Sequence, residues 1–320
     1  MSTRTPSSPG SPAAGFAFGM GAYLAWGFIA IYFKALKSVP AMLVLGHRVV
    51  WSVAFLAIVL GVRRELWSAV RCLRDRKTLL VLVGSTAMIG INWFTFIWAV
   101  ERGRLVEASF GYFINPLVNV ALGVLVLKER LRAGQLVAIA LAAAGVALMA
   151  WSLGEVPRIS LALALSFGFY GLLRKIAPVG PLVGLSLETA LLLPLAAGYV
   201  LWRGTEPGNG LFDHGVQVGL LLMFSGVVTA IPLLWFAAAA RRLRLATIGF
   251  MQYLAPTCQL GLAVLVYGEP FEPDRARSFG LIWAAIAVFT VDSVIRLRRG
   301  AAEARAARAE AEVVPVSEPA

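Results

Sequence analysis

Long stretches of apolar residues separated by short polar connections form the dominant pattern along this chain. Each stretch is close to the ~20 residues that a helix needs to cross a bilayer. We therefore predict an all-α polytopic membrane protein with ten transmembrane helices. The predicted helices cover residues 15–33, 40–61, 79–100, 106–127, 133–152, 157–174, 182–202, 216–239, 246–267 and 278–295.

The two ends of the chain depart from this pattern. Residues 1–14 are rich in serine and proline, which indicates a disordered segment. This segment lacks the compact basic region and cleavage site of a signal peptide, so we expect the first helix to be retained. Residues 298–320 have no apolar face to bury, and we predict a tail there.

Composition and charge exclude several classes of protein. Of the 320 residues, 59% are hydrophobic and 14% are charged, whereas soluble proteins carry about 25% charged residues. The net charge of +12 comes from basic residues in short connections and in the tail. A nucleic-acid-binding protein would need a basic face on a folded domain, so we predict no nucleic-acid partner. The two cysteines and two histidines show no metal-ligand spacing, and we expect neither a metal nor a cofactor.

The distribution of positive charge predicts the orientation in the membrane. Ten helices place both termini on one side. If that side is the cytoplasm, 20 of the 29 lysines and arginines face it and 8 face outward. Cytoplasmic connections of membrane proteins carry an excess of positive charge, so we predict that both termini are cytoplasmic.

The chain contains an internal repeat. Residues 96–130 align without a gap to residues 236–270, and 12 of the 35 positions are identical. The matches that are hardest to obtain by chance pair Arg102 with Arg242, Arg104 with Arg244, Pro116 with Pro256 and Glu129 with Glu269. A shift of 141 residues aligns the earlier helices and places Lys34 on Lys175. We therefore predict two five-helix repeats, at 15–152 and 153–297.

An odd number of helices in each repeat means that the second copy enters the membrane inverted. Inverted repeats are typical of secondary transporters, whose substrate site lies near the midplane between the halves. The pattern therefore predicts a central substrate pocket.

Polar groups interrupt the predicted helix at 106–127. Tyr112, Asn115 and Asn119 are spaced three and four residues apart, so they share one face of the helix. Pro116 lies beside them and is expected to loosen the helix. Polar groups that face lipid are costly, so this stripe is expected to point into the bundle or into a wet cavity.

The second copy keeps part of this stripe. The equivalent positions hold Gln252, Ala255 and Gln259, again beside a proline, Pro256. Amides in membrane helices also hydrogen-bond to neighbouring helices as a purely structural device. Because the stripe occurs in both copies, we favour a role in lining a cavity, and we include the adjacent Tyr253.

Two further groups are candidates for function. Asn92 and Trp93 lie where the predicted third helix would face the pocket, although tryptophan is also an ordinary interface anchor. His47, Arg48 and Glu188 lie about 10 Å inside their predicted helices. Intramembrane ionisable groups are functional candidates, and proton coupling through His47 or Glu188 is one hypothesis for their role. Arg48 has the alternative of extending toward the outer headgroups.

These motifs resemble those of the RarD branch of the EamA transporters, in the drug/metabolite transporter superfamily. The resemblance runs from about residue 15 to 297. It rests on HRVVWS (47–52), NWFTFIWAV (92–100), EASFGYFINPLVN (107–119), FGFYGLLRK (167–175), RLRLATIGFMQYLAPT (242–257) and YGE (267–269). The first copy departs from the pattern at Lys128, which stands in place of a glycine before Glu129.

The resemblance implies a transporter of small molecules in a bacterial inner membrane, with export favoured over uptake. We predict alternating access between the repeats and no enzymatic activity, because no cluster of acid, base and nucleophile occurs. The alternatives are a receptor or scaffold, or a facilitative channel without coupled transport. The predicted pocket offers amides and aromatic rings rather than charges, so we expect a neutral or zwitterionic substrate.

Overall fold

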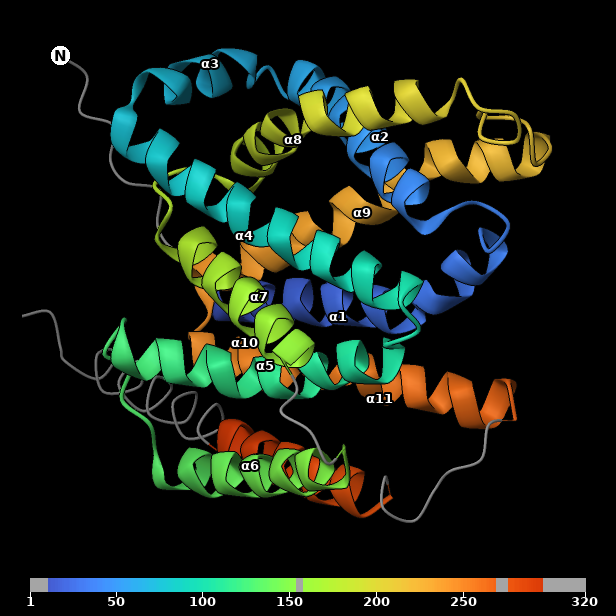
Figure 1. Cartoon of the computed structure of the whole chain (residues 1–320). Coiled ribbons are helices and arrows are strands. Elements are labelled where there is room, and N and C mark those ends of the chain that lie inside the picture. The colour runs from blue at the N-terminus through green and yellow to red at the C-terminus, as the bar shows by residue number, and fades with distance from the viewer. Residues whose placement is uncertain (1–10, 154–157, 269–275, 296–320) are drawn as a thin grey trace, which may run out of the picture. The chain divides into compact units, whose positions relative to one another are not determined.

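The computed structural model describes residues 11–153, 158–268 and 276–295, which form helices joined by short connections (Figure 1). Ten helical segments in these ranges are long and apolar enough to cross a membrane. The predicted all-α polytopic membrane fold is therefore confirmed. The helices are α1 (Pro12–Ala35), α2 (Ala41–Val62), α3 (Leu66–Arg74), α4 (Arg76–Glu101), α5 (Leu105–Leu125), α6 (Ala133–Leu153), α7 (Arg158–Ile176), α8 (Pro181–Arg203), α9 (Val216–Arg242), α10 (Leu245–Gln252), α11 (Leu254–Gly261), η1 (Leu262–Val266) and Ala276–Ile295.

Local sequence explains where two of these helices begin. Asp75 precedes α4, and its carboxylate accepts hydrogen bonds from the backbone N–H groups of Lys77 and Thr78, both at 3.3 Å. Such a cap satisfies donors that have no partner inside the helix. Helix α1 begins at Pro12, three residues before the predicted start, with Ser11 as its cap. The rest of the predicted disordered segment and the predicted tail at 298–320 lie outside the described residues.

Helix α3 was not predicted, because its nine residues are too few to cross a bilayer and lie within a basic connection. Its apolar side chains Leu66, Trp67, Val70 and Leu73 are exposed, and only Ala69 is buried. A short amphipathic helix of this kind is typical of a membrane interface.

The two prolines of the repeat have different effects. Helix α5 continues through Pro116, whereas the second copy divides into α10 and α11 after Gln252. A proline ring clashes with the carbonyl four residues earlier, and Gln252 lies four residues before Pro256. Helix α10 packs closely on α5 at Gly249, where a Cβ would lie 2.7 Å from the carbonyl oxygen of Pro116.

Contacts divide the chain into two compact units, and most of the transmembrane helices belong to the larger one. The larger unit contains α1–α5 and α7–η1. In its core the rings of Tyr170 and Phe236 stack at 5.9 Å, next to the buried Tyr23. Helices α2 and α9 approach closely at Gly226, where a Cβ would collide with the backbone of Trp51.

The smaller unit contains α6 and the helix Ala276–Ile295. These two helices pack at Gly145, where a Cβ would lie 3.0 Å from the carbonyl oxygen of Ser278. Arg132 forms an ion pair with Asp292 at 3.7 Å. The two compact units have other bounds than the predicted repeats at 15–152 and 153–297, because the units are defined by contacts and the repeats by sequence similarity. The repeats stay a prediction.

Candidate functional site

The larger unit contains a cavity of about 950 Å³. Helices α1, α2, α4, α5, α7, α9, α10 and α11 contribute to its wall, together with the connection between α1 and α2. Aromatic rings supply much of the apolar surface. The side chains with charged, amide or hydroxyl groups on this wall are Tyr23, Lys34, Lys37, Ser38, Arg48, Asn92, Ser109, Tyr112, Thr229, Gln252 and Gln259.

Five of the predicted site residues lie on this wall: Asn92, Trp93, Tyr112, Gln252 and Gln259. The Nδ2 of Asn92 donates hydrogen bonds to the carbonyl oxygen of Leu163 at 2.9 Å and to Ser166 Oγ at 3.1 Å. The Nε2 of Gln259 donates to the carbonyl oxygen of Trp26 at 3.1 Å. Both amides are thus oriented by hydrogen bonds to helices α7 and α1.

Three other predicted pocket residues lie beside the cavity rather than on its wall. Asn119 is fully buried, and its Nδ2 donates to Gln252 Oε1 at 3.0 Å. The hydroxyl of Tyr253 donates to the carbonyl oxygen of Phe113 at 3.3 Å. Asn115 is 2% exposed, and its Oδ1 has no hydrogen-bond partner among the described residues. Asn119 therefore orients a cavity residue, Gln252, instead of facing the cavity itself.

Arg48 lies on the wall of the cavity. Its Nε donates to the Thr229 hydroxyl at 3.0 Å, which joins α2 to α9. Its guanidinium carbon lies 5.2 Å from the ring centroids of both Phe33 and Trp93. These distances are within the range of cation–π attraction.

The cavity carries positive charge, so the expectation of a wall without charges is wrong. Lys34, Lys37 and Arg48 line it, and no aspartate or glutamate of the described residues does. Phe33 and Arg48 come together through the packing of successive helices, which the sequence pattern does not reveal.

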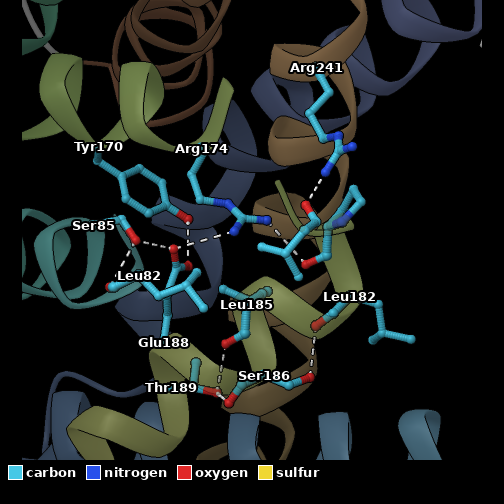
Figure 2. Close-up of polar contacts among 12 residues, drawn as sticks. Leu82, Ser85, Tyr170, Arg174, Leu182, Leu185, Ser186, Glu188, Thr189 and Arg241 are labelled. Carbon is cyan, nitrogen blue, oxygen red and sulfur yellow. Dashed lines mark hydrogen bonds and ion pairs between the residues drawn. The ribbon is translucent and has the colours of Figure 1, made fainter. Parts of the chain in front are cut away.

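A second buried polar cluster surrounds Glu188 (Figure 2). Its Oε1 lies 3.4 Å from Arg174 Nη1 and accepts a hydrogen bond from Ser85 Oγ at 2.5 Å. The Tyr170 hydroxyl lies 3.4 Å from its other oxygen, Oε2. Arg174 and Glu188 are 0% and 1% exposed, so each provides the other's buried counter-charge.

The fold makes room for this ion pair at Gly184 of α8. A Cβ there would lie 2.1 Å from Arg174 Nη1. The sequence alone did not predict that Arg174 pairs with Glu188.

His47, the other predicted coupling residue, is 5% exposed on α2 and does not line the cavity. Its Nδ1 has no hydrogen-bond partner among the described residues. Glu188 is paired with Arg174, and no ion pair or hydrogen bond joins His47 to Glu188 among the described residues. No group of three or more potential metal ligands occurs in the part of the chain that the structure describes.

Comparison with known proteins places this architecture in a family. Residues 13–151 match the model of the EamA-like transporter family. An uncharacterized transporter of Vibrio cholerae is 46% identical over 91% of this chain and 96% of its own length. Protein RarD of Salmonella typhimurium is 44% identical, over 89% of this chain and 97% of its own length. The chain belongs to the RarD branch of the EamA transporter family.

This membership makes the protein a multi-pass membrane transporter of the drug/metabolite class and not an enzyme, as the sequence predicted. A crystal structure of a protein with 20% identity superimposes on the transporter with a TM-score of 0.68. The superposition covers 88% of this chain and 98% of that one. At this identity the likeness supports the fold alone.

Away from the cavity, two glutamates of the transporter bind the starts of other helices. Glu129 accepts hydrogen bonds from the backbone N–H groups of Leu245 and Ala246, at 2.9 and 3.3 Å. Lys175 lies 3.7 Å from the same carboxylate. Glu107 accepts a hydrogen bond from the N–H of Ile159 at 2.9 Å. A carboxylate at a helix N-terminus is stabilised by the helix dipole. Glu129 therefore holds the start of α10, and Glu107 holds the start of α7 against α5.

Proposed function

We propose that the protein is a secondary transporter that exports small organic metabolites or drugs across a bacterial inner membrane, with both termini in the cytoplasm. The observation that carries this proposal is the cavity of about 950 Å³, whose wall combines aromatic rings with oriented amides. Organic ligands bind in such cavities through apolar contact, while a few fixed polar groups set their orientation.

Alternating access is the proposed mechanism. The cavity wall includes the α1–α2 connection, which the predicted orientation places outside. On the predicted cytoplasmic side, Glu129 fastens the start of α10, and Lys175 lies beside it. We infer that this conformation is open to the outside. An inward-open state would require the contacts of Glu129 to break, while the predicted inverted repeats exchange their conformations.

We propose two roles for the predicted pocket residues, contact with the substrate and positioning of the residues that contact it. Asn92, Trp93, Tyr112, Gln252 and Gln259 are proposed to contact the substrate from the cavity wall. The proposed positioning residues behind them are Asn115, Asn119 and Tyr253.

Proton coupling through His47 or Glu188 stays a hypothesis. The ion pair with Arg174 gives Glu188 a structural role that needs no proton transfer. Flux into proteoliposomes, measured with and without a pH gradient, tests the coupling. Flux that is independent of the gradient would exclude both residues as proton carriers.

The main test is substrate flux in proteoliposomes with purified protein, using labelled amino acids and chloramphenicol as first substrates. Tyr112→Phe removes a hydroxyl from the cavity wall and is expected to lower flux about 2- to 10-fold, the effect of one hydrogen bond. Tyr199→Phe is the matched control, because Tyr199 lies on α8 outside the cavity wall. Equal flux in both variants would place the substrate pathway outside this cavity. If the substrate only equilibrates between the two sides and is never concentrated on one of them, a channel is favoured.

A further inference from the structure

Arg48 is held in a fixed position inside the membrane. It is the eighth residue of α2, about 10 Å along the helix at 1.5 Å per residue. Thr229 accepts a hydrogen bond from its Nε, and the rings of Phe33 and Trp93 lie against the guanidinium. The side chain is therefore oriented before any ligand arrives, which reduces the entropy that binding would cost.

The charge of Arg48 has no counter-ion in the described part of the chain. The ion pairs there involve other cations, and no described carboxylate lines the cavity. Its two Nη atoms have no hydrogen-bond acceptor among these residues. The contrast with Arg174, whose Nη1 lies 3.4 Å from Glu188, shows that this fold supplies a carboxylate where an arginine is sealed in.

An intramembrane cation is costly unless an anion or water compensates it. A guanidinium also presents two parallel N–H groups that match the two oxygens of a carboxylate. We infer that the cavity binds organic anions, with the carboxylate of the ligand on Arg48 and its apolar or aromatic body against the surrounding rings. This inference rests on the proposed function and names its substrate class.

The rest of the wall agrees with an amphiphilic acid. Trp26, Trp93, Phe96 and Tyr112 offer ring surfaces for an aromatic body. Lys34, in the last turn of α1, and Lys37, in the α1–α2 connection, lie at the cavity, where positive charge favours the approach of an anion. Since no described carboxylate faces the cavity, an ammonium group has no partner there, and a zwitterion is expected to bind more weakly than an acid.

The test compares 1-naphthylacetate with 1-naphthylacetamide, which have nearly the same shape and differ in charge. Binding is measured by calorimetry on the full chain in phosphatidylcholine nanodiscs. We expect the acid to bind at least about 10-fold more tightly than the amide, the effect of a charge-assisted hydrogen bond. Equal affinities, tighter binding of the amide, or no binding of the acid at millimolar concentration would overturn the inference.

Arg48→Gln should remove the preference for the acid, so that the acid and the amide bind with similar affinity. Arg48→Lys keeps the charge without the paired N–H groups, so it should retain part of the preference, and it provides a second variant if Arg48→Gln fails to fold. Arg203→Gln is the matched control, because Arg203 also lies against a tryptophan ring but outside the cavity wall. An equal loss of both affinities in Arg48→Gln would show a structural role and overturn the inference.

A phosphate of an anionic lipid has the same chemistry as the proposed ligand group. Phosphatidylglycerol nanodiscs distinguish the two sources. Unchanged affinity for the acid supports an organic anion, whereas competition by phosphatidylglycerol that disappears in Arg48→Gln assigns the site to lipid and overturns the inference. Flux of chloramphenicol that depends on Tyr112 would keep the transporter proposal in place even if the acid fails to bind.

Discussion

Arg48 of α2 and Arg174 of α7 both lie among the packed helices of the larger unit, and their surroundings differ. Arg174 is 0% exposed and forms an ion pair with Glu188, which Ser85 and Tyr170 also contact. Arg48 is half-buried on the cavity wall and contacts a hydroxyl and two rings, without a described carboxylate. The charge of Arg174 is neutralised by Glu188, whereas the charge of Arg48 is available to a ligand.

The internal repeat relates these two sites. A shift of 141 residues places Arg174 on Phe33 and Glu188 on His47, while Arg48 falls on Thr189. The second copy therefore has an acid and a base where the first has an aromatic ring and a histidine. Under the predicted duplication, a closed ion-pair cluster in one copy corresponds to part of the positively charged cavity wall in the other.

The largest effect is expected from Glu188→Ala, which leaves the charge of Arg174 buried without a partner. Removing one member of a buried ion pair costs about 3–5 kcal/mol. Unfolding of the purified protein in mixed micelles, followed by circular dichroism, measures the loss. Arg48→Gln is the comparison, and its stability is expected to stay close to that of the unchanged chain. An equal loss in both variants would contradict the division into a structural and a binding arginine.

A smaller loss is expected from Gly184→Ala, because the new methyl group would lie 2.1 Å from Arg174 Nη1 unless the guanidinium moves. Overpacking of this kind costs about 1–3 kcal/mol. Gly198→Ala on the same helix is the matched control, because nothing lies within 4 Å of a Cβ there. The control should be neutral or stabilising, since alanine is the better helix former. Equal stability in the two variants would show that the guanidinium can move without cost.

The fold was largely predictable, because membrane helices follow from the length and polarity of each apolar run. The exceptions arise from local physics that hydropathy does not measure. Helix α3 is too short for the pattern, and its exposed apolar side chains alternate with arginines. Both copies carry the proline, but only the second helix divides, after Gln252, so the proline alone does not explain the break.

The candidate site was predictable only in part. The helical spacing identified Tyr112, and the repeat identified Gln252 and Gln259, all on the cavity wall. The partners of the two arginines could not be inferred, because they are distant in sequence or lie on other helices. Thr229 is 181 positions from Arg48, and such contacts depend on how the helices pack.

Two hydroxyls provide a finer comparison, because each bonds to a different cluster. Ser85→Ala removes a hydrogen bond to the Glu188 carboxylate and is expected to lower stability by about 1.5 kcal/mol. Thr229→Val removes the hydrogen bond from Arg48 and should cost less than about 1 kcal/mol, while affinity for 1-naphthylacetate falls about 3-fold. Unfolding and calorimetry on the same preparations separate these effects. A loss of acid affinity in Ser85→Ala but not in Thr229→Val would reverse the proposed roles.

The smallest effect is expected at Asp75, a fully exposed carboxylate that provides the reference for a charge in water. The hydrogen bond from the Thr78 side chain and the backbone N–H groups of Lys77 and Thr78 lower the pKa of Asp75 from its ordinary value. Because the folded pKa is the lower one, the cap contributes fully above the ordinary pKa of about 3.9 and is lost as pH falls through the folded pKa. Thermal unfolding between pH 6 and pH 3, compared with Asp75→Asn, isolates this contribution, since asparagine keeps the cap but does not titrate. The two proteins should have similar unfolding temperatures at pH 6. Near pH 3 the Asp75→Asn variant should unfold at the higher temperature, because only the unchanged chain loses its cap to protonation. A difference that changes near neutral pH would show that Asp75 interacts with a group other than the start of α4.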